Sequence, residues 1–267
     1  MRHSIVTGGS SGIGKAIALK LARQGDHVSI LARDAGRLQQ AKAEIEAVRR
    51  SDQQRVLGLS VDVSDRAAIS ESIEEAITTL GAPHRLITCA GVARPGRFQA
   101  MSAEIFEQAM SVNYFGTLYC IQAVVPYMLD QQSGQICLVS SGAAFIGLYG
   151  YSAYGASKFA VRGLAESLRA ELKPEGIQVF VAYPPDTDTP QLREENKTKP
   201  AATKKITATA KLWQADDVAD VILRGMEQGR FAISPGLEMG ILSRFHSLIS
   251  PLLNRYFDGI VARSSAL

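Results

Sequence analysis

The chain has 267 residues, of which 46% are hydrophobic, so one α/β domain with a sizeable core is the simplest expectation. Its 29 basic and 26 acidic side chains give a net charge of +3, which does not call for a nucleic-acid partner. Cys89, Cys120 and Cys137 lack CxxC spacing, so we expect reduced thiols in a cytosolic compartment. The four histidines are dispersed, and no metal site is expected.

No targeting or membrane-spanning segment is expected. Only Met1 and Arg2 precede the first strand-like residues, which leaves no room for a signal peptide. Near the C-terminus, Arg244 and Arg255 enclose ten residues without formal charge. A spanning helix needs roughly 20 apolar residues. The sequence therefore predicts a cytoplasmic protein, and peripheral contact with the cytoplasmic face of a membrane stays open.

Apolar runs of strand length alternate with longer helical patterns along the chain. The predicted strands are Ser4–Thr7, His27–Leu31, Arg55–Val61, Leu86–Cys89, Gln135–Ser140 and Gln178–Tyr183. The first predicted helices are Ile13–Arg23, Asp34–Arg50 and one that Ser64 or Asp65 caps. Because the strands are almost continuously apolar, the pattern predicts a Rossmann-type, doubly wound parallel sheet with helices on both faces.

A glycine-rich turn, TGGSSGIG, joins the first predicted strand to the first helix. Glycine lets the backbone approach a pyrophosphate, and the helix N-terminus offers free N–H groups to the anion. The spacing is not that of a Walker loop, so nucleoside triphosphate hydrolysis is disfavoured. We expect the turn to bind a dinucleotide through Gly8, Ser10, Ser11, Gly12, Ile13 and Gly14.

The end of the second strand predicts which dinucleotide binds. A carboxylate there would accept hydrogen bonds from the ribose 2′-OH of NAD, but this chain has Arg33. A guanidinium matches a 2′-phosphate in charge and geometry, so NADP(H) is the expected cofactor. Arg37 is either a second contact or a solvated residue. Asp62 and Val63, after the third strand, are expected at the adenine edge, although Asp62 could equally cap the next helix.

A tyrosine and a lysine lie at the head of a helix expected to end near Leu172. Tyr154 and Lys158 are four residues apart and therefore share a helix face. A phenol titrates near ~10 in water, and a close ammonium lowers that pKa toward the range of a general acid or base. Ser141, thirteen residues before Tyr154, could hydrogen-bond the substrate oxygen, with Ser140 as the alternative.

Asn113 is a further candidate, because a buried amide in an apolar helical pattern needs a partner. In this order, behind the glycine turn, these residues resemble the short-chain dehydrogenase/reductase family over about residues 4–233. The resemblance implies that Tyr154 is the acid/base, and that Lys158 lowers its pKa and binds the nicotinamide ribose. It also implies that Ser141 orients a carbonyl and that Asn113 holds a water in a proton relay.

The same resemblance implies further cofactor contacts, beyond Tyr154 and Lys158, at Ala90, Gly91, Pro184, Thr187 and Thr189. The chain departs from the family pattern in two places. Cys89 stands in the family's Asn-Ala-Gly segment, which removes a side-chain hydrogen bond but no catalytic group. Pro184-Pro185 replaces the usual Pro-Gly.

The segment AYPPDTDTP, with LYGYSAY and KFAVRGLAE, resembles one branch of the family, the 3-ketodihydrosphingosine (3-dehydrosphinganine) reductases. That resemblance implies NADPH-driven reduction of a long-chain amino ketone to dihydrosphingosine in sphingolipid biosynthesis. The substrate ammonium could pair with Asp186 or Asp188, which could equally stabilise the proline-rich turn. Two alternatives stay open: reduction of another apolar ketone, and an NADP(H) sensor without turnover, which the retained catalytic residues disfavour.

Residues 1–235 are expected to form the NADP(H)-binding domain, with a substrate lid at about 190–213, and 236–267 an amphipathic helical extension. Pro251 should kink or split that helix. Its apolar stripe could face the core, a homo-oligomer interface or a membrane. The stripe consists of Leu237, Ile241, Phe245, Leu248, Leu252, Tyr256 and Ile260.

Overall fold

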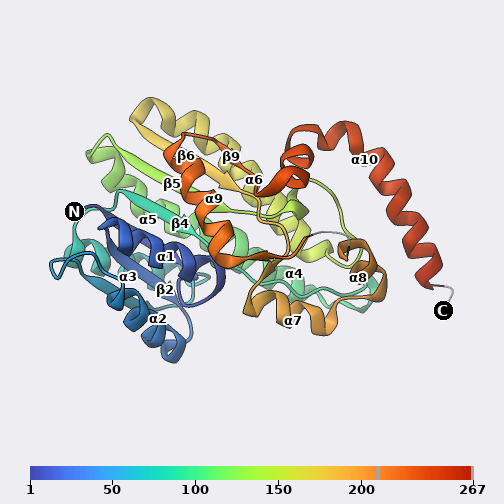
Figure 1. Cartoon of the computed structure of the whole chain (residues 1–267), viewed down its shortest axis with the longest axis horizontal. Helices are drawn as coiled ribbons and strands as arrows, with labels where there is room; N and C mark the ends of the chain where they lie inside the picture. Colours follow the sequence, from blue (N-terminus) through green and yellow to red (C-terminus); the bar gives the residue numbers. More distant parts are fainter. Residues whose placement is uncertain (209–210, 266–267) are drawn as a thin grey trace.

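A computed structural model describes residues 1–208 and 211–265 of the chain. Its centre is a seven-stranded parallel sheet in the order β3-β2-β1-β4-β5-β6-β9 (Figure 1). The strands are β1 (His3–Thr7), β2 (His27–Ala32), β3 (Val56–Ser60), β4 (Arg85–Thr88), β5 (Gly134–Val139), β6 (Ile177–Ala182) and β9 (Ala232–Ile233). All six predicted strands are present, and the doubly wound α/β fold is confirmed; β9 was not predicted.

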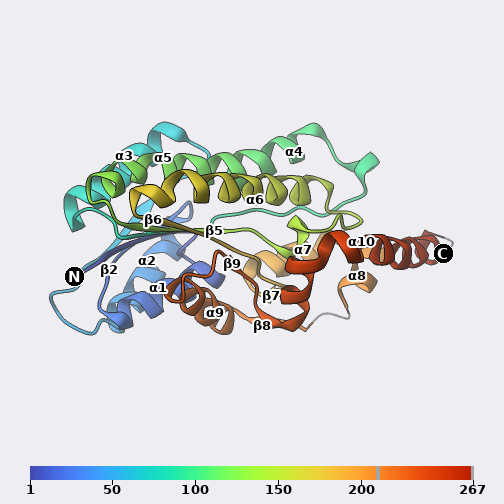
Figure 2. The same ribbon diagram turned by 90° about the horizontal axis from the view of Figure 1, so that it is seen from above.

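Helices cover both faces of the sheet, as Figure 2 shows. One face carries α3 (Arg66–Leu80), α4 (Ala103–Ala109), α5 (Gly116–Asp130) and α6 (Ser152–Leu172). The other carries α1 (Gly12–Gln24), α2 (Ala35–Ala47) and α9 (Ala215–Glu227). Each face has its own buried cluster, so the strands are apolar on both sides. Asp34 caps α2, and Asp65 rather than Ser64 caps α3 by accepting from Ala68 N at 3.1 Å.

The amino ends of the strands are joined by a buried ion pair. Asp26, whose side chain is 2% exposed, accepts hydrogen bonds from Arg85 at 2.8 Å and from Ser4 at 2.7 Å. Strand β9 pairs only with Val181 and Ala182 of β6. A groove of about 840 Å³ therefore borders the unpaired first part of β6. Its basic lining residues are Arg2, Arg85, Arg169 and Lys173.

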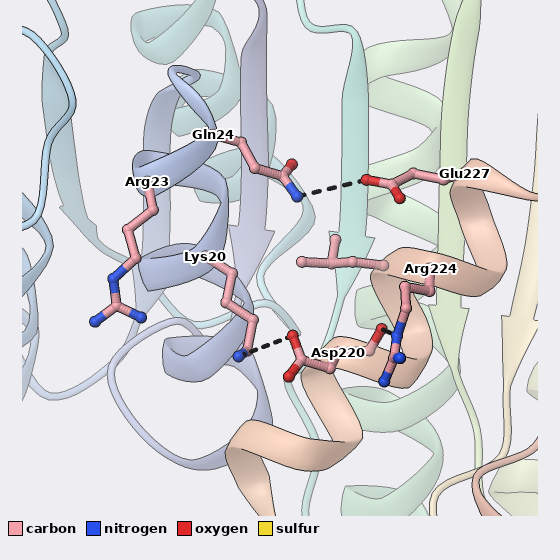
Figure 3. A pocket seen from close by; sticks show the side chains of 7 residues that line it. Lys20, Arg23, Gln24, Asp220, Arg224 and Glu227 are labelled. Atoms are coloured by element: carbon pink, nitrogen blue, oxygen red, sulfur yellow. Dashed lines mark hydrogen bonds and ion pairs between the residues drawn. The ribbon is translucent and has the colours of Figure 1, made fainter.

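A smaller pocket of about 220 Å³ separates α1 from α9 (Figure 3). Two side chains of α1, Lys20 and Gln24, contact carboxylates of α9 across the gap. Lys20 lies 2.9 Å from both Asp216 and Asp220, and Gln24 donates to Glu227 at 3.4 Å. These contacts join the two helices.

The chain beyond β6 builds up the carboxyl edge of the sheet. The two-residue strands β7 (Thr187–Asp188) and β8 (Trp213–Gln214) pair with each other. Between them, the predicted lid contains the helices α7 (Pro190–Thr198) and α8 (Ala201–Thr207). Residues 209–210 of that predicted segment lie outside the described residues.

The C-terminal extension forms one helix, α10 (Gly236–Ser265), with Pro251 inside it. The predicted residues 266 and 267 lie outside the described part of the chain. The helix changes direction along its length and reaches away from the sheet (Figures 1 and 2). Met239 and Leu242 pack against the core, whereas the stripe is exposed except for Ile260. No helix among residues 1–208 and 211–265 is long and apolar enough to span a bilayer.

Candidate active site

The predicted site residues lie on the turns and helix starts at the carboxyl edge of the sheet. Gly8 to Gly14 follow β1, Arg33 and Arg37 follow β2, Asp62 and Val63 follow β3, and Ala90 and Gly91 follow β4. Ser141 follows β5, Tyr154 and Lys158 begin α6, and Pro184, Thr187 and Thr189 follow β6. Because carboxyl ends of parallel strands share one edge, residues that follow six strands converge there.

The glycine turn has a backbone that only glycine fits. Gly8 has φ of +66°, and a Cβ on it would lie 2.8 Å from Ala90 N. A Cβ on Gly14 would collide with the carbonyl oxygen of Gly8. Ser11 N-caps α1 without a side-chain cap hydrogen bond. The turn therefore presents backbone at the start of α1, as an anion site requires.

Arg33 is the cation nearest to the end of β2. Its guanidinium is about half exposed and lies 3.7 Å from Asp62, whereas Arg37 pairs with Asp34 at 3.4 Å within its own helix. Burial works against ionisation of Asp62, but hydrogen bonds from Ser64 and the charge of Arg33 hold its pKa below the usual value.

Val63 is buried and packs in the core beneath these groups. Its side chain meets the position that a Cβ on Gly116 would occupy. The adenine contact expected of Val63 stays a prediction, as does the one expected of Asp62.

Lys158 fastens helix α6 to the end of β5. Its ammonium, in a residue 5% exposed, donates to Val139 O at 3.0 Å and lies 5.6 Å from the centre of the Tyr154 ring. Ser140 donates to Lys158 O at 2.9 Å, so that hydroxyl has a structural partner. The Ser141 hydroxyl accepts from Ala143 N at 3.2 Å, and its polar group beside the Tyr154 phenol acts to lower the pKa of that phenol. This geometry favours Ser141 over Ser140 as the hydroxyl next to the phenol.

The surroundings of Tyr154 oppose the expected lowering of the pKa of its phenol. Burial raises the pKa of its phenol, the negative charge of Glu195 raises it further, and the neighbouring Ser141 hydroxyl acts to lower it. Burial also lowers the pKa of Lys158 to about 8. The expected lowering of the Tyr154 pKa by Lys158 stays a prediction.

Asn113 lies in a π-helical turn, η2 (Met110–Phe115), between α4 and α5. The fully buried amide accepts from Val92 N at 2.8 Å and donates to Val92 O at 3.0 Å. It also donates to Ser157 Oγ at 2.8 Å, which ties it to α6. Single π turns inside α-helices often occur at functional sites. The hydrogen bonds explain why an amide is buried in an apolar helix.

The loop after β6 covers the site. Thr189 caps α7, and its methyl group is 3.0 Å from the position of a Cβ on Gly12. Thr187 is buried and donates to Pro185 O at 2.8 Å. The segment therefore lies directly over the glycine turn.

Both aspartates suggested for the substrate ammonium already have a cation. Asp186 lies 3.6 Å from the buried Lys199, and Asp188 lies 3.0 Å from Arg193. Pairing of either aspartate with a substrate stays a prediction.

Sequence reasoning missed Glu195, which is 7% exposed and accepts from Tyr151 Oη at 2.7 Å. No local pattern distinguishes it from its exposed neighbour Glu194, because both occur in a charged stretch. Its burial depends on how α7 packs against Tyr151, the residue before α6.

Comparison with known proteins fits this arrangement. The profile described as short chain dehydrogenase matches residues 2–200. The chain belongs to the short chain dehydrogenase family. Its fold matches a solved short chain dehydrogenase/reductase from Burkholderia phymatum in complex with NAD. That match has a TM-score of 0.80 and 25% identity, and covers 91% of each chain.

Two curated relatives of this short chain dehydrogenase are similar over most of its length. It is 45% identical to the 3-dehydrosphinganine reductase of Danio rerio, over 94% of this chain and 76% of the relative. It is 44% identical to the 3-ketodihydrosphingosine reductase of Mus musculus with the same coverage. The predicted membership of the family is confirmed, and so is the prediction that the protein is an oxidoreductase.

The buried ammonium predicts a pH-dependent stability difference. The pKa of Lys158 is about 8 in the fold and near the model-compound value of 10.5 in an unfolded chain, so the folded state holds this proton less tightly. Stability should therefore be reduced below pH 8 and recover as pH rises toward 10.5. We expect Lys158→Met to raise the free energy of unfolding by about 1–2 kcal/mol at neutral pH, so that it unfolds at a higher urea concentration than wild type. Near pH ~9.5 the increase in the free energy of unfolding should be smaller.

Urea denaturation at both pH values measures this difference. Lys173→Met, at an exposed position, is the matched control and should show no pH-dependent gain. A Lys158→Met protein that is less stable than wild type at both pH values would contradict the prediction.

Proposed function

We propose that this chain reduces the ketone of a long-chain amino ketone of the 3-ketodihydrosphingosine type to the secondary alcohol, with NADPH as the cofactor. The observation that carries the proposal is identity of 43–45% over 94% of the chain to three curated relatives that bear this activity in their names. The convergence of Ser141, Tyr154 and Lys158 supports carbonyl chemistry at the site.

The residues present fit a nicotinamide dinucleotide. The crowded backbone at Gly8 and Gly14 supports close approach of a pyrophosphate, which the N-terminus of α1 would receive. Arg33 would hold the 2′-phosphate, with Arg37 as the second candidate. Lys158 would hold the nicotinamide ribose, and Thr187 and Thr189 the nicotinamide end. When bound, NADPH supplies the hydride that reduces the carbonyl carbon.

The residues of the chain would handle the proton. Tyr154 donates its phenolic proton to the carbonyl oxygen as that oxygen gains charge, and Ser141 donates a hydrogen bond that orients the same oxygen. The ammonium of Lys158 favours the phenolate that remains. Asn113 positions α6 through Ser157 and would support proton supply to Tyr154.

Replacing the phenol tests this assignment. Wild type with NADPH should convert 3-ketodihydrosphingosine to dihydrosphingosine, one equivalent per NADPH oxidised. Tyr154→Phe should lower kcat by about 100-fold or more, because the general acid is lost. Tyr256→Phe, at an exposed site on α10, is the control and should retain activity. Undiminished turnover by Tyr154→Phe would remove Tyr154 from the mechanism.

Cofactor choice is tested at the end of β2. Arg33→Ala should weaken NADPH binding by about 30-fold and leave NADH binding nearly unchanged, because only NADPH carries the phosphate. Protein fluorescence quenching gives both dissociation constants. Arg37→Ala reports whether the second arginine contributes, and Arg23→Ala, exposed near the end of α1, is the control. Equal losses for both dinucleotides would contradict the NADP(H) assignment.

We further propose that α10 rests on a membrane surface and that the protein is peripheral at the cytoplasmic face. Leu248 and Leu252 are 76% and 73% exposed, and such contiguous apolar surface is unfavourable in water. The proposed lipid substrate resides in membranes, where these side chains would be buried. Arg244 and Arg255 are also exposed on this helix, where they could meet anionic headgroups.

Vesicle flotation tests the membrane contact. A Leu248→Ser/Leu252→Ser double variant should bind phosphatidylglycerol vesicles at least about tenfold more weakly than wild type, because two exposed apolar side chains are lost. Asn254→Ser, on the same helix, is the matched control and should bind as wild type does. Equal flotation of all three proteins would argue against the membrane contact.

A further inference from the structure

Glu195 is a buried carboxylate on α7 with two neutral hydrogen-bond donors. Its Oε2 accepts from Tyr151 Oη at 2.7 Å and its Oε1 accepts from Gln191 Nε2 at 2.9 Å. The residue is only 7% exposed. Among the described residues, no ion pair to Glu195 occurs within 4 Å. A buried carboxylate without a cation lowers the stability of the fold, so its presence calls for a functional reason.

This carboxylate lies beside the group proposed to protonate the carbonyl. The ring of Tyr151, which holds Glu195, is 5.7 Å from the ring of Tyr154 at 62°. The negative charge of Glu195 raises the pKa of Tyr154 and acts in the same direction on Lys158. Glu195 is therefore electrostatically coupled to both members of the pair on α6.

Gln191 connects the carboxylate to the rest of the site. A Cβ built on Gly91 would lie 3.9 Å from Gln191 Oε1, 3.6 Å from Lys158 Nζ and 3.2 Å from Asn113 Oδ1. The amide that donates to Glu195 thus borders the same small region as the lysine and asparagine. Glu195 and its donors form one wall of the site.

The other carboxylates of this segment have cations. Asp186 lies near Lys199, Asp188 near Arg193, and Glu194 near Lys197 at 2.6 Å on the surface. A positively charged group entering the site would have to compete for each of these three. Glu195 has only neutral partners, which orient it without cancelling its charge.

We propose that Glu195 binds the ammonium of the substrate and so selects an amino ketone over a plain ketone. The inference rests on the proposed function, because it takes the amino group from that substrate class. The amino carbon is bonded directly to the carbonyl carbon, so the ammonium must lie close to Tyr154 when the carbonyl oxygen does. A carboxylate coupled to that phenol is the natural partner for the ammonium.

The test compares two substrates and a pair of neighbouring variants. Glu195→Gln and Glu194→Gln each replace a carboxylate by an amide of the same shape, one buried and one exposed. Each protein reduces 3-ketodihydrosphingosine and a ketone of equal chain length without the amino group, with NADPH. Glu195→Gln should lower kcat/KM for the amino ketone by about 100-fold. Any effect of Glu195→Gln on the pKa of Tyr154 changes kcat/KM for both ketones alike, so the loss for the amino ketone should exceed the loss for the plain ketone by about 30-fold or more. Glu194→Gln should resemble wild type.

Melting temperatures and NADPH affinity check that Glu195→Gln is folded. If that variant is unstable, Glu195→Asp keeps the charge and should retain a preference for the amino ketone. Equal losses on both substrates in Glu195→Gln would overturn the proposal, as would loss of the preference in Glu195→Asp. A selective loss in Asp186→Asn with Glu195→Gln active would also overturn it. A wild-type protein that fails to reduce the amino ketone would refute the proposed function itself, which separates the two failures.

Discussion

The attachment of α6 to the end of β5 is the constraint on which the candidate site depends. Ser140 binds the carbonyl of Lys158, and the ammonium of Lys158 binds the carbonyl of Val139. Together the two contacts fix the first turns of α6 against the edge of the sheet. This attachment places a cation in the interior, and burial lowers the pKa of Lys158 to about 8. The direction in which Tyr154 faces depends on the same attachment of α6.

A second set of contacts, from the π turn η2, also holds α6 in place. Asn113 reaches Ser157 on α6 and both backbone groups of Val92 after β4. It can do so because a π turn interrupts the helical hydrogen-bond ladder at that position. Elements that follow β4 and β5 thus share one buried polar network, and such networks are rigid when every member is satisfied.

The sequence was sufficient for features that depend on local chemistry. The spacing of apolar residues and the local composition predicted six strands, the glycine turn and the helix that carries Tyr154 and Lys158. The π turn at Asn113 could not be predicted, because its hydrogen bonds are made to Val92 and Ser157, far away in the chain. Glu195 was missed for the same reason: its burial depends on Tyr151, and residue type alone does not separate it from Glu194. Likewise, the exposure of Leu248 depends on where α10 leaves the body of the protein.

The shortness of β9 has a consequence for self-association. Within residues 1–208 and 211–265, most of the outer margin of β6 has no neighbouring strand. Such margins can recruit the same margin of a second molecule into a continuous sheet. Here the side chains of Arg169 and Lys173 border that margin. Two copies brought edge to edge would place like charges against each other. Mutual repulsion of these charges would disfavour edge-to-edge pairing along the part of β6 that β9 leaves unpaired.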